Sequence, residues 1–143
     1  MPFQFAYGVA NSNVPVPAPW AMGGTGAYND GDLLTIDTTT GYAGTVAPGD
    51  PGTVVGVFAG TRASGTAGQL GTIYLITPDQ IWKCSTNAAT YAVKPGAGSV
   101  QVVNAGTISS TPGTTTSAVL YDASTLDASG NVIAYVRFKT TSF

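Results

Sequence analysis

The sequence predicts an all-β fold, a compact antiparallel β-sandwich or barrel with an extended N-terminal arm. Short runs of β-branched and aromatic residues are separated by Gly, Pro, Asn and Asp, a pattern typical of strands and turns. The 143 residues include 21 Thr and 19 Gly but only 6 Leu, and charged residues make up 8% of the chain. Coiled coils and helix bundles are much richer in Leu and in charge, so this composition excludes them.

The first 30 residues differ from the rest of the chain, and residues 1–29 contain no charged side chain. One short strand is expected at 3–9. Proline then alternates with apolar residues in Val14–Trp20, which favours an extended, polyproline-like segment with an incomplete hydrogen-bond ladder. We interpret residues 1–30 as an arm that lies on a surface of this subunit or of another one. The side chains expected to make that contact are Phe3, Phe5, Tyr7, Trp20 and Met22.

Residues 31–143 are expected to form a single β domain. At this length one core is sufficient. Eight short, closely spaced strands separated by turn residues predict the sandwich or barrel. The expected strands are Leu33–Asp37, Tyr42–Val46, Thr53–Ala59, Gly71–Ile76, Gln80–Ser85, Ser99–Val103, Ser117–Asp122 and Val132–Lys139.

The last of these strands alternates clearly between two faces. Val132, Ala134, Val136 and Phe138 should face the core, which leaves both basic residues of the opposite face, Arg137 and Lys139, in solvent.

Two segments are less regular. The sequence Thr77-Pro78-Asp79-Gln80 fits either a helix start with a capping box or a type I turn. Its flanks are β-branched and aromatic, which favours a hairpin joining the strands on either side. Residues 104–116 are rich in Ser, Thr and Gly, and we interpret them as a long polar loop.

The composition also limits the chemistry, because the chain has no His, no Glu and a single Cys. A Ser-His-Asp or Cys-His arrangement cannot be built, nor can a zinc site of the ordinary type. We therefore expect no enzyme activity, no catalytic residues, no cofactor and no metal site.

Two small motifs have alternative interpretations. A thiol at Cys84 beside Lys83 could be activated by the neighbouring cation, but burial as a small apolar residue is the preferred interpretation. Asn29-Asp30-Gly31-Asp32 resembles part of a calcium loop but lacks its later Glu, and it is also ordinary turn chemistry. Whether Asp30 and Asp32 bind a cation stays open at this point.

Charge and targeting patterns indicate which partners to expect. The net charge is −2 and the sequence contains no cluster of Lys or Arg, so direct binding to nucleic acid is not expected. The start of the chain lacks the features of a secretory signal, and no stretch is long enough to span a bilayer. With one Cys and no glycosylation sequon, the chain is expected to fold in a reducing cytoplasm without contact to a membrane.

Three motifs point to a family. Gly31-Asp32-Leu33-Leu34-Thr35-Ile36-Asp37, then Thr40-Gly41-Tyr42-Ala43-Gly44-Thr45-Val46, then Gly56-Val57-Phe58-Ala59-Gly60 resemble the head decoration, or capsid cement, proteins of tailed bacteriophages. The resemblance implies a non-enzymatic protein whose subunits, often trimeric, sit outside an icosahedral shell at the junctions between capsomers.

The resulting expectation is a structural virion protein that decorates and stabilises a phage capsid by binding the major capsid protein. It would be made in the host cytoplasm, act on the outer surface of the capsid and form a homo-oligomer, with a trimer favoured. The alternative is a tail- or fibre-associated β domain that binds carbohydrate through exposed Trp and Tyr side chains, since such rings can stack on a sugar while their polar tips donate hydrogen bonds.

Overall fold

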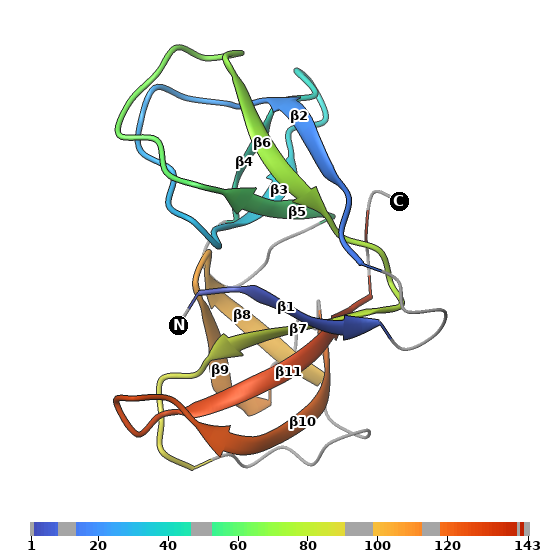
Figure 1. Cartoon of the computed structure of the whole chain (residues 1–143), viewed down its shortest axis with the longest axis vertical. Helices are drawn as coiled ribbons and strands as arrows, with labels where there is room; N and C mark the ends of the chain where they lie inside the picture. Colours follow the sequence, from blue (N-terminus) through green and yellow to red (C-terminus); the bar gives the residue numbers. More distant parts are fainter. Residues whose placement is uncertain are drawn as a thin grey trace.

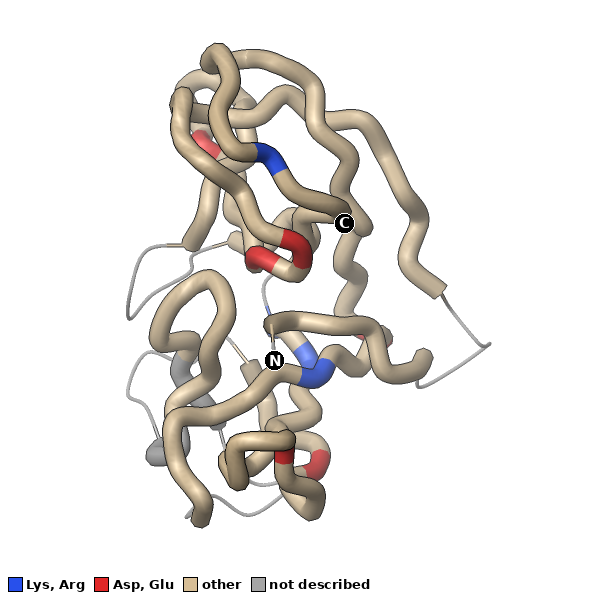
Figure 2. Tube along the Cα trace, turned by 60° about the vertical axis from the view of Figure 1, so that its left-hand side comes forward, with Lys and Arg blue, Asp and Glu red and all other residues tan. Residues whose placement is uncertain are grey.

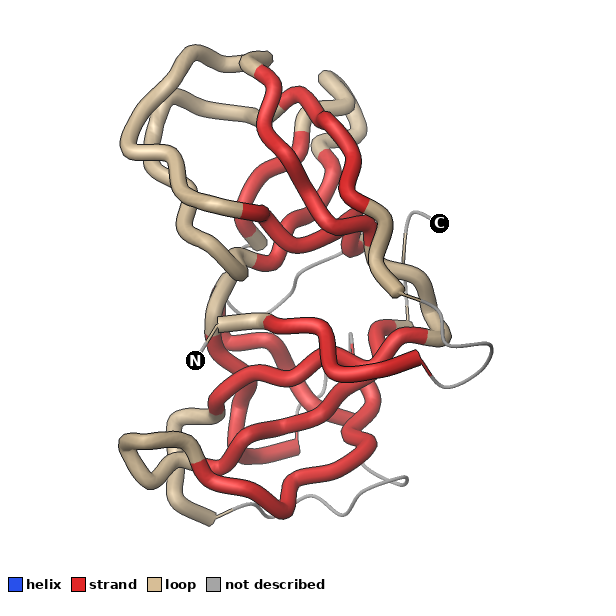
Figure 3. The backbone as a smooth tube through the Cα atoms, in the orientation of Figure 1, coloured by secondary structure: helices blue, strands red, loops and turns tan. Residues whose placement is uncertain are grey.

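The computed structural model describes residues 2–8, 14–46, 53–90, 99–112, 118–139 and 141, and these ranges contain strands and loops but no helix (Figure 3). The predicted all-β class is confirmed. The strands are β1 Gln4–Gly8, β2 Pro17–Ala21, β3 Leu33–Ile36, β4 Ala43–Thr45, β5 Val54–Ala59, β6 Leu70–Leu75, β7 Gln80–Ser85, β8 Ser99–Asn104, β9 Thr107–Pro112, β10 Ala118–Leu126 and β11 Val132–Phe138.

The strands form two sheets, which lie one above the other in Figure 1. The upper sheet has five strands in the order β2-β6-β5-β3-β4, and the lower sheet has six in the order β1-β7-β11-β10-β8-β9. Neighbouring strands run antiparallel in both sheets. The antiparallel arrangement therefore agrees with the prediction.

Each sheet curls so that distant strands approach one another. In the five-stranded sheet, a parallel bridge joins Met22, just after β2, to Ala43 at the start of β4. In the six-stranded sheet, a parallel bridge joins Thr86, just after β7, to Ile108 in β9. The concave faces enclose apolar side chains, and β1 is left on the outside of β7.

The apolar core has two parts. The larger cluster lies between the sheets, where Leu33 and Val57 of the upper sheet meet Trp82 and Phe138 of the lower sheet. The smaller cluster lies on the other face of the five-stranded sheet. It contains Met22, Tyr28, Leu34, Ala43, Val55, Phe58 and Ile73. Because successive side chains of a strand point to opposite faces, β3 and β5 contribute to both parts.

Every strand expected from the sequence is present, most with ends shifted by one residue. In β11, Val132, Ala134, Val136 and Phe138 are buried and Arg137 is exposed, which confirms the predicted faces.

Three expectations about local structure were wrong. Residues 17–21 form strand β2, and residues 107–112 form strand β9 where a polar loop was expected. The turn after β6 does not make a hairpin, because β6 belongs to the five-stranded sheet and β7 to the six-stranded sheet. The N–H of Gln80 donates to the carbonyl of Thr77 at 3.2 Å, which closes a turn that carries the chain from one sheet to the other.

The N-terminal segment is extended, and in the described ranges it lies on this chain's own sheets. Strand β1 pairs with β7 at the edge of one sheet, and β2 pairs with β6 at the edge of the other. Two prolines can stand in β2 because of its register. Val16 and Met22 form the backbone hydrogen bonds to the β6 side, so the nitrogens of Pro17 and Pro19 face away from β6, where no ladder bond is lost.

Candidate partner-binding surface

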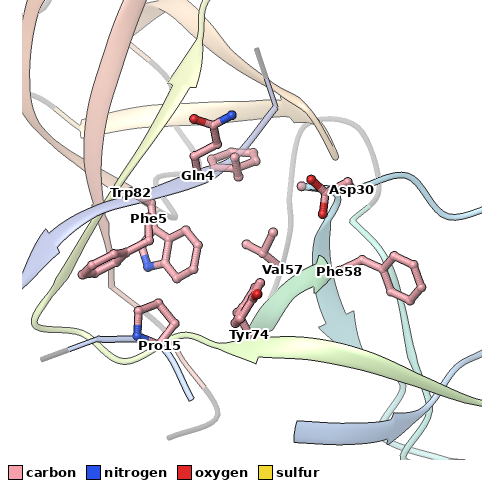
Figure 4. A pocket seen from close by; sticks show the side chains of 10 residues that line it. Gln4, Phe5, Pro15, Asp30, Val57, Phe58, Tyr74 and Trp82 are labelled. Carbon is pink, nitrogen blue, oxygen red and sulfur yellow. The ribbon is translucent and has the colours of Figure 1, made fainter. Parts of the chain in front are cut away.

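A cleft of about 420 Å³ opens between the two sheets. One wall is formed by the start of β1 with Trp82 of β7 behind it, and the other by Val57 of β5 and Tyr74 of β6. Figure 4 shows the Trp82 and Tyr74 rings on opposite sides of this space, while the Phe58 ring turns away from it. Pro15 lies at one end of the cleft and Asp30 at the other (Figure 4).

The turn at Asp30-Gly31 holds β1 beside the upper sheet. The N–H of Phe3 donates to the carbonyl of Gly31 at 3.2 Å, and the N–H of Gly31 donates to Phe58 at 2.9 Å. Gly31 has φ of 87°, and a Cβ there would lie 2.7 Å from the Cβ of Pro2. Only glycine therefore fits this approach without strain.

Polar groups are few in the cleft. The Oδ1 atom of Asp30 accepts a hydrogen bond from the N–H of Gly60 at 2.8 Å, which fixes the carboxylate at its corner. The indole N–H of Trp82 donates to Oε1 of Gln80 at 3.3 Å. Among the residues that the structure describes, the lining contains this one carboxylate and no Lys or Arg, and charged residues are sparse along the described parts of the tube in Figure 2. An apolar pocket with a few placed polar groups is typical of a binding site.

An exposed apolar surface continues from the cleft. Tyr74 and Tyr7 are each 41% exposed, and Val14 and Val16 are 64% and 59% exposed. Tyr7 and Val14 share a shallow hollow of about 230 Å³, and the carbonyl of Val16 accepts the N–H of Leu75 next to Tyr74 at 3.0 Å. We call the cleft together with these four side chains the junction surface. Contiguous exposed apolar groups of this kind mark interaction sites.

A pair of tyrosines extends the junction surface onto the outer face of the six-stranded sheet. The rings of Tyr7 and Tyr121 meet edge to face with their centres 6.0 Å apart. Burial raises the pKa of the Tyr7 phenol, and the nearby Tyr121, Asp122 and Tyr135 groups raise it further. Tyr7 therefore stays neutral and a hydrogen-bond donor well into the alkaline range.

The five contact residues expected from the sequence fall into two groups. Phe3 and Met22 are buried in this chain's own core clusters. Phe5 lines the cleft and packs edge to face on Trp82, and Tyr7 is exposed beside it. Trp20 lies on the five-stranded sheet, where its indole N–H donates to the carbonyl of Gly41 at 3.0 Å. The structure thus brings Phe5 and Tyr7 together and places Trp20 elsewhere.

Sequence reasoning missed Val14, Val16 and Tyr74 as surface residues. Tyr74 alternates with buried Ile73 along β6, a pattern that fits a half-exposed strand, but no sequence signal places it opposite β1. The exposure of Val14 and Val16 could have been expected from the sequence, because both residues flank Pro15 in a segment with few hydrogen-bond partners.

Two further candidate residues from the sequence, Cys84 and Asp32, are held by contacts within the fold. Cys84 is buried, as preferred, and burial raises the pKa of its thiol to about 12. In the turn before β3, Oδ2 of Asp32 accepts the N–H of Asn29 at 2.8 Å, so this carboxylate serves the turn. Among the described residues, no group of three or more Cys or Asp side chains is placed to hold a metal ion.

A scan against protein-family models finds no match for the chain, and searches of the curated proteins and of the solved structures find no match either. In the described ranges no helix is long and apolar enough to cross a membrane.

Proposed function

We propose that this protein is a non-enzymatic structural component of a phage virion, which binds the major capsid protein at capsomer junctions on the outside of the shell. The observation that carries the proposal is the junction surface, an apolar cleft between the two sheets flanked by the exposed side chains of Tyr7, Val14, Val16 and Tyr74. Three of these four residues belong to the N-terminal segment, which has no charged residue before Asp30. The resemblance of residues 31–60 to head decoration proteins gives the class of partner.

The junction surface suits attachment because apolar area is already gathered there. Its exposed side chains lie on β1, on residues 14–16 and on β6, and backbone hydrogen bonds hold β1, Val16 and β6 in place. A surface that is ordered before binding loses little conformational entropy when a partner covers it. Self-association as a homo-oligomer, with a trimer favoured, is part of the same proposal and would be measured by light scattering.

The test is co-sedimentation with capsids that lack the protein. Replacing Tyr7 and Tyr74 together by Ser should lower the affinity for such capsids at least about tenfold, since two half-exposed anchors at a contact typically contribute more than 1.4 kcal/mol. Leu126→Ser is the matched control, because Leu126 is 59% exposed at the end of β10 and outside the junction surface. Native binding by the double variant would refute the proposal.

A second candidate function is favoured by the Tyr7–Tyr121 pair. Half-exposed tyrosines on one face form a platform on which a sugar ring could stack, as expected for a tail- or fibre-associated domain. Titration with saccharides tests this function: binding that is lost in Tyr121→Ala, together with unchanged capsid affinity in that variant, would favour it over the first candidate.

A further inference from the structure

The cleft is bordered by a strand edge whose backbone groups are oriented toward it. In a strand, alternate residues direct their N–H and C=O groups to the same edge. The N–H of Phe3 donates away from β7, to the carbonyl of Gly31, so the N–H and C=O of Phe5 also face the cleft. Among the strands that the structure describes, none pairs with this edge of β1.

The opposite wall offers side chains to a segment lying along that edge. Val57 and Tyr74 face β1 across the cleft, and Trp82 lies beside Phe5 (Figure 4). An added strand would donate to and accept from Phe5 while its alternate side chains entered the apolar space. This combination of a free edge and a pocket is how extended peptides are recognised by strand addition.

The Asp30 carboxylate in the cleft favours bound segments that contain a basic residue. Asp30 stands at one end of this space, held by the N–H of Gly60, and the described residues that line the cleft include no Lys or Arg to neutralise it. A Lys or Arg side chain on the bound segment could reach the carboxylate while its aliphatic stem covered apolar groups. An acidic side chain at the same place would be repelled.

We propose that the cleft binds an extended segment of the partner protein, which adds to the edge of β1 and places a Lys or Arg side chain against Asp30. The inference deepens the proposed function, because the partner would be the major capsid protein. It specifies a strand and a basic residue where the proposed function specifies only an apolar contact.

The test uses a blocked pentapeptide, acetyl-Thr-Val-Lys-Val-Thr-amide, and the same peptide with Glu in place of Lys, titrated into the whole chain with ¹⁵N-labelled backbone. We expect the Lys peptide to shift the Phe5 amide resonance and to bind at least about fivefold more tightly than the Glu peptide at low salt. Equal affinities, or a Phe5 amide that does not respond, would overturn the proposal.

Two variants isolate the carboxylate. Asp30→Asn keeps an oxygen for the Gly60 N–H and removes the charge, and it should reduce the preference for Lys to less than about twofold. Asp37→Asn is the control, since Oδ1 of Asp37 likewise accepts a backbone N–H, from Thr39 at 2.8 Å, and lies outside the cleft lining. A preference that survives Asp30→Asn would exclude Asp30 as the partner of the Lys side chain.

Capsid binding separates the two proposals. If Asp30→Asn binds capsids like the native chain while Tyr7→Ser with Tyr74→Ser does not, the proposed function stands and the basic segment is excluded. If the peptides behave as expected but the native chain does not bind capsids, strand addition at β1 stands and the capsid partner is excluded.

Discussion

The guanidinium carbon of Arg62 lies 4.7 Å from the centre of the Tyr28 ring, and the backbones of the same two residues exchange a pair of hydrogen bonds of 2.8 Å. Arg62 also donates from Nε to the carbonyl of Gly26 at 3.2 Å and from one terminal nitrogen to the carbonyl of Gly24 at 3.1 Å. One side chain thereby fixes the glycine-rich loop that follows β2 to the loop before β6.

Arg62→Lys should destabilise the fold although the charge is kept. An ammonium group cannot reproduce the planar fork that bonds two carbonyls while stacking on a ring. We expect a loss of about 1–2 kcal/mol in the free energy of unfolding, measured by urea denaturation. Arg137→Lys, at an exposed position of β11, should change stability by less than about 0.5 kcal/mol. Equal effects of the two substitutions would contradict the role assigned to Arg62.

Met22→Ala should destabilise the chain strongly. The Met22 side chain is fully buried in the smaller core cluster, so truncation leaves a cavity. Its backbone N–H, which donates to the carbonyl of Gln69 at 3.0 Å, is kept in the variant. The expected cost is about 3 kcal/mol in the free energy of unfolding. Leu70→Ala is the control, because Leu70 follows Gln69 but is 69% exposed. A small effect of Met22→Ala would show that residues near 22 are not part of the core.

Gly31→Ala should loosen β1 from the upper sheet. A Cβ at this position would meet Pro2 and the carbonyl of Phe3, which lies 2.9 Å away, in addition to the strain of a φ of 87°. Gly130 has φ of 84° and nothing within 4 Å of such a Cβ, so Gly130→Ala measures the backbone strain alone. We expect about 1–2 kcal/mol for Gly130→Ala and a clearly larger loss for Gly31→Ala in thermal denaturation.

The buried Cys84 thiol predicts that the stability of the fold decreases at alkaline pH. Burial raises the pKa of Cys84 from its ordinary value of 9.0 to about 12, and its Sγ donates to the carbonyl of Gly106 at 3.1 Å. The unfolded chain therefore loses this proton at a lower pH than the folded chain. The contribution of the protonated thiol to the free energy of unfolding is complete below pH 9 and disappears as the pH rises toward 12.

Two measurements check this prediction. Iodoacetamide at pH 8 should modify Cys84 only as fast as the chain unfolds, because the folded thiol is protonated and enclosed. Between pH 9 and 12 the native chain should lose more stability than Cys84→Ala, in which the titrating group is absent. Rapid modification of the folded chain, or identical pH profiles, would contradict the buried environment.

The sequence predicted the strands whose own residues show a strand pattern, such as alternation. It missed the strands that can be recognised only from their place in a sheet. In β11 the alternation from Val132 to Phe138 is sufficient to assign both the strand and its buried face. Strand β2 contains Pro17 and Pro19, residues that argue against a strand until its edge position is known. Strand β9 consists mostly of Thr and Ser, with Ile108 as its one aliphatic residue, and is recognisable only through its pairing with β8.

The candidate site depended even more on tertiary structure. Phe5 and Tyr7 could be selected from composition, since they are aromatic residues in an uncharged segment. Their partner across the cleft, Tyr74, could not, because the turn after β6 sends the chain into the other sheet and thereby brings β1 opposite β6. The expected hairpin would have placed these segments differently.

The two prolines of β2 affect how neighbouring copies of the molecule can pair through their sheet edges. If many copies are held side by side, edge strands of neighbouring molecules come within reach of one another and can fuse into continuous sheets. At Pro17 and Pro19 the outward side of β2 has carbonyl groups but no N–H, so two such edges would set acceptor against acceptor. This side of β2 therefore disfavours edge-to-edge pairing between neighbouring molecules, whereas Gln4–Gly8 of β1 contains no proline.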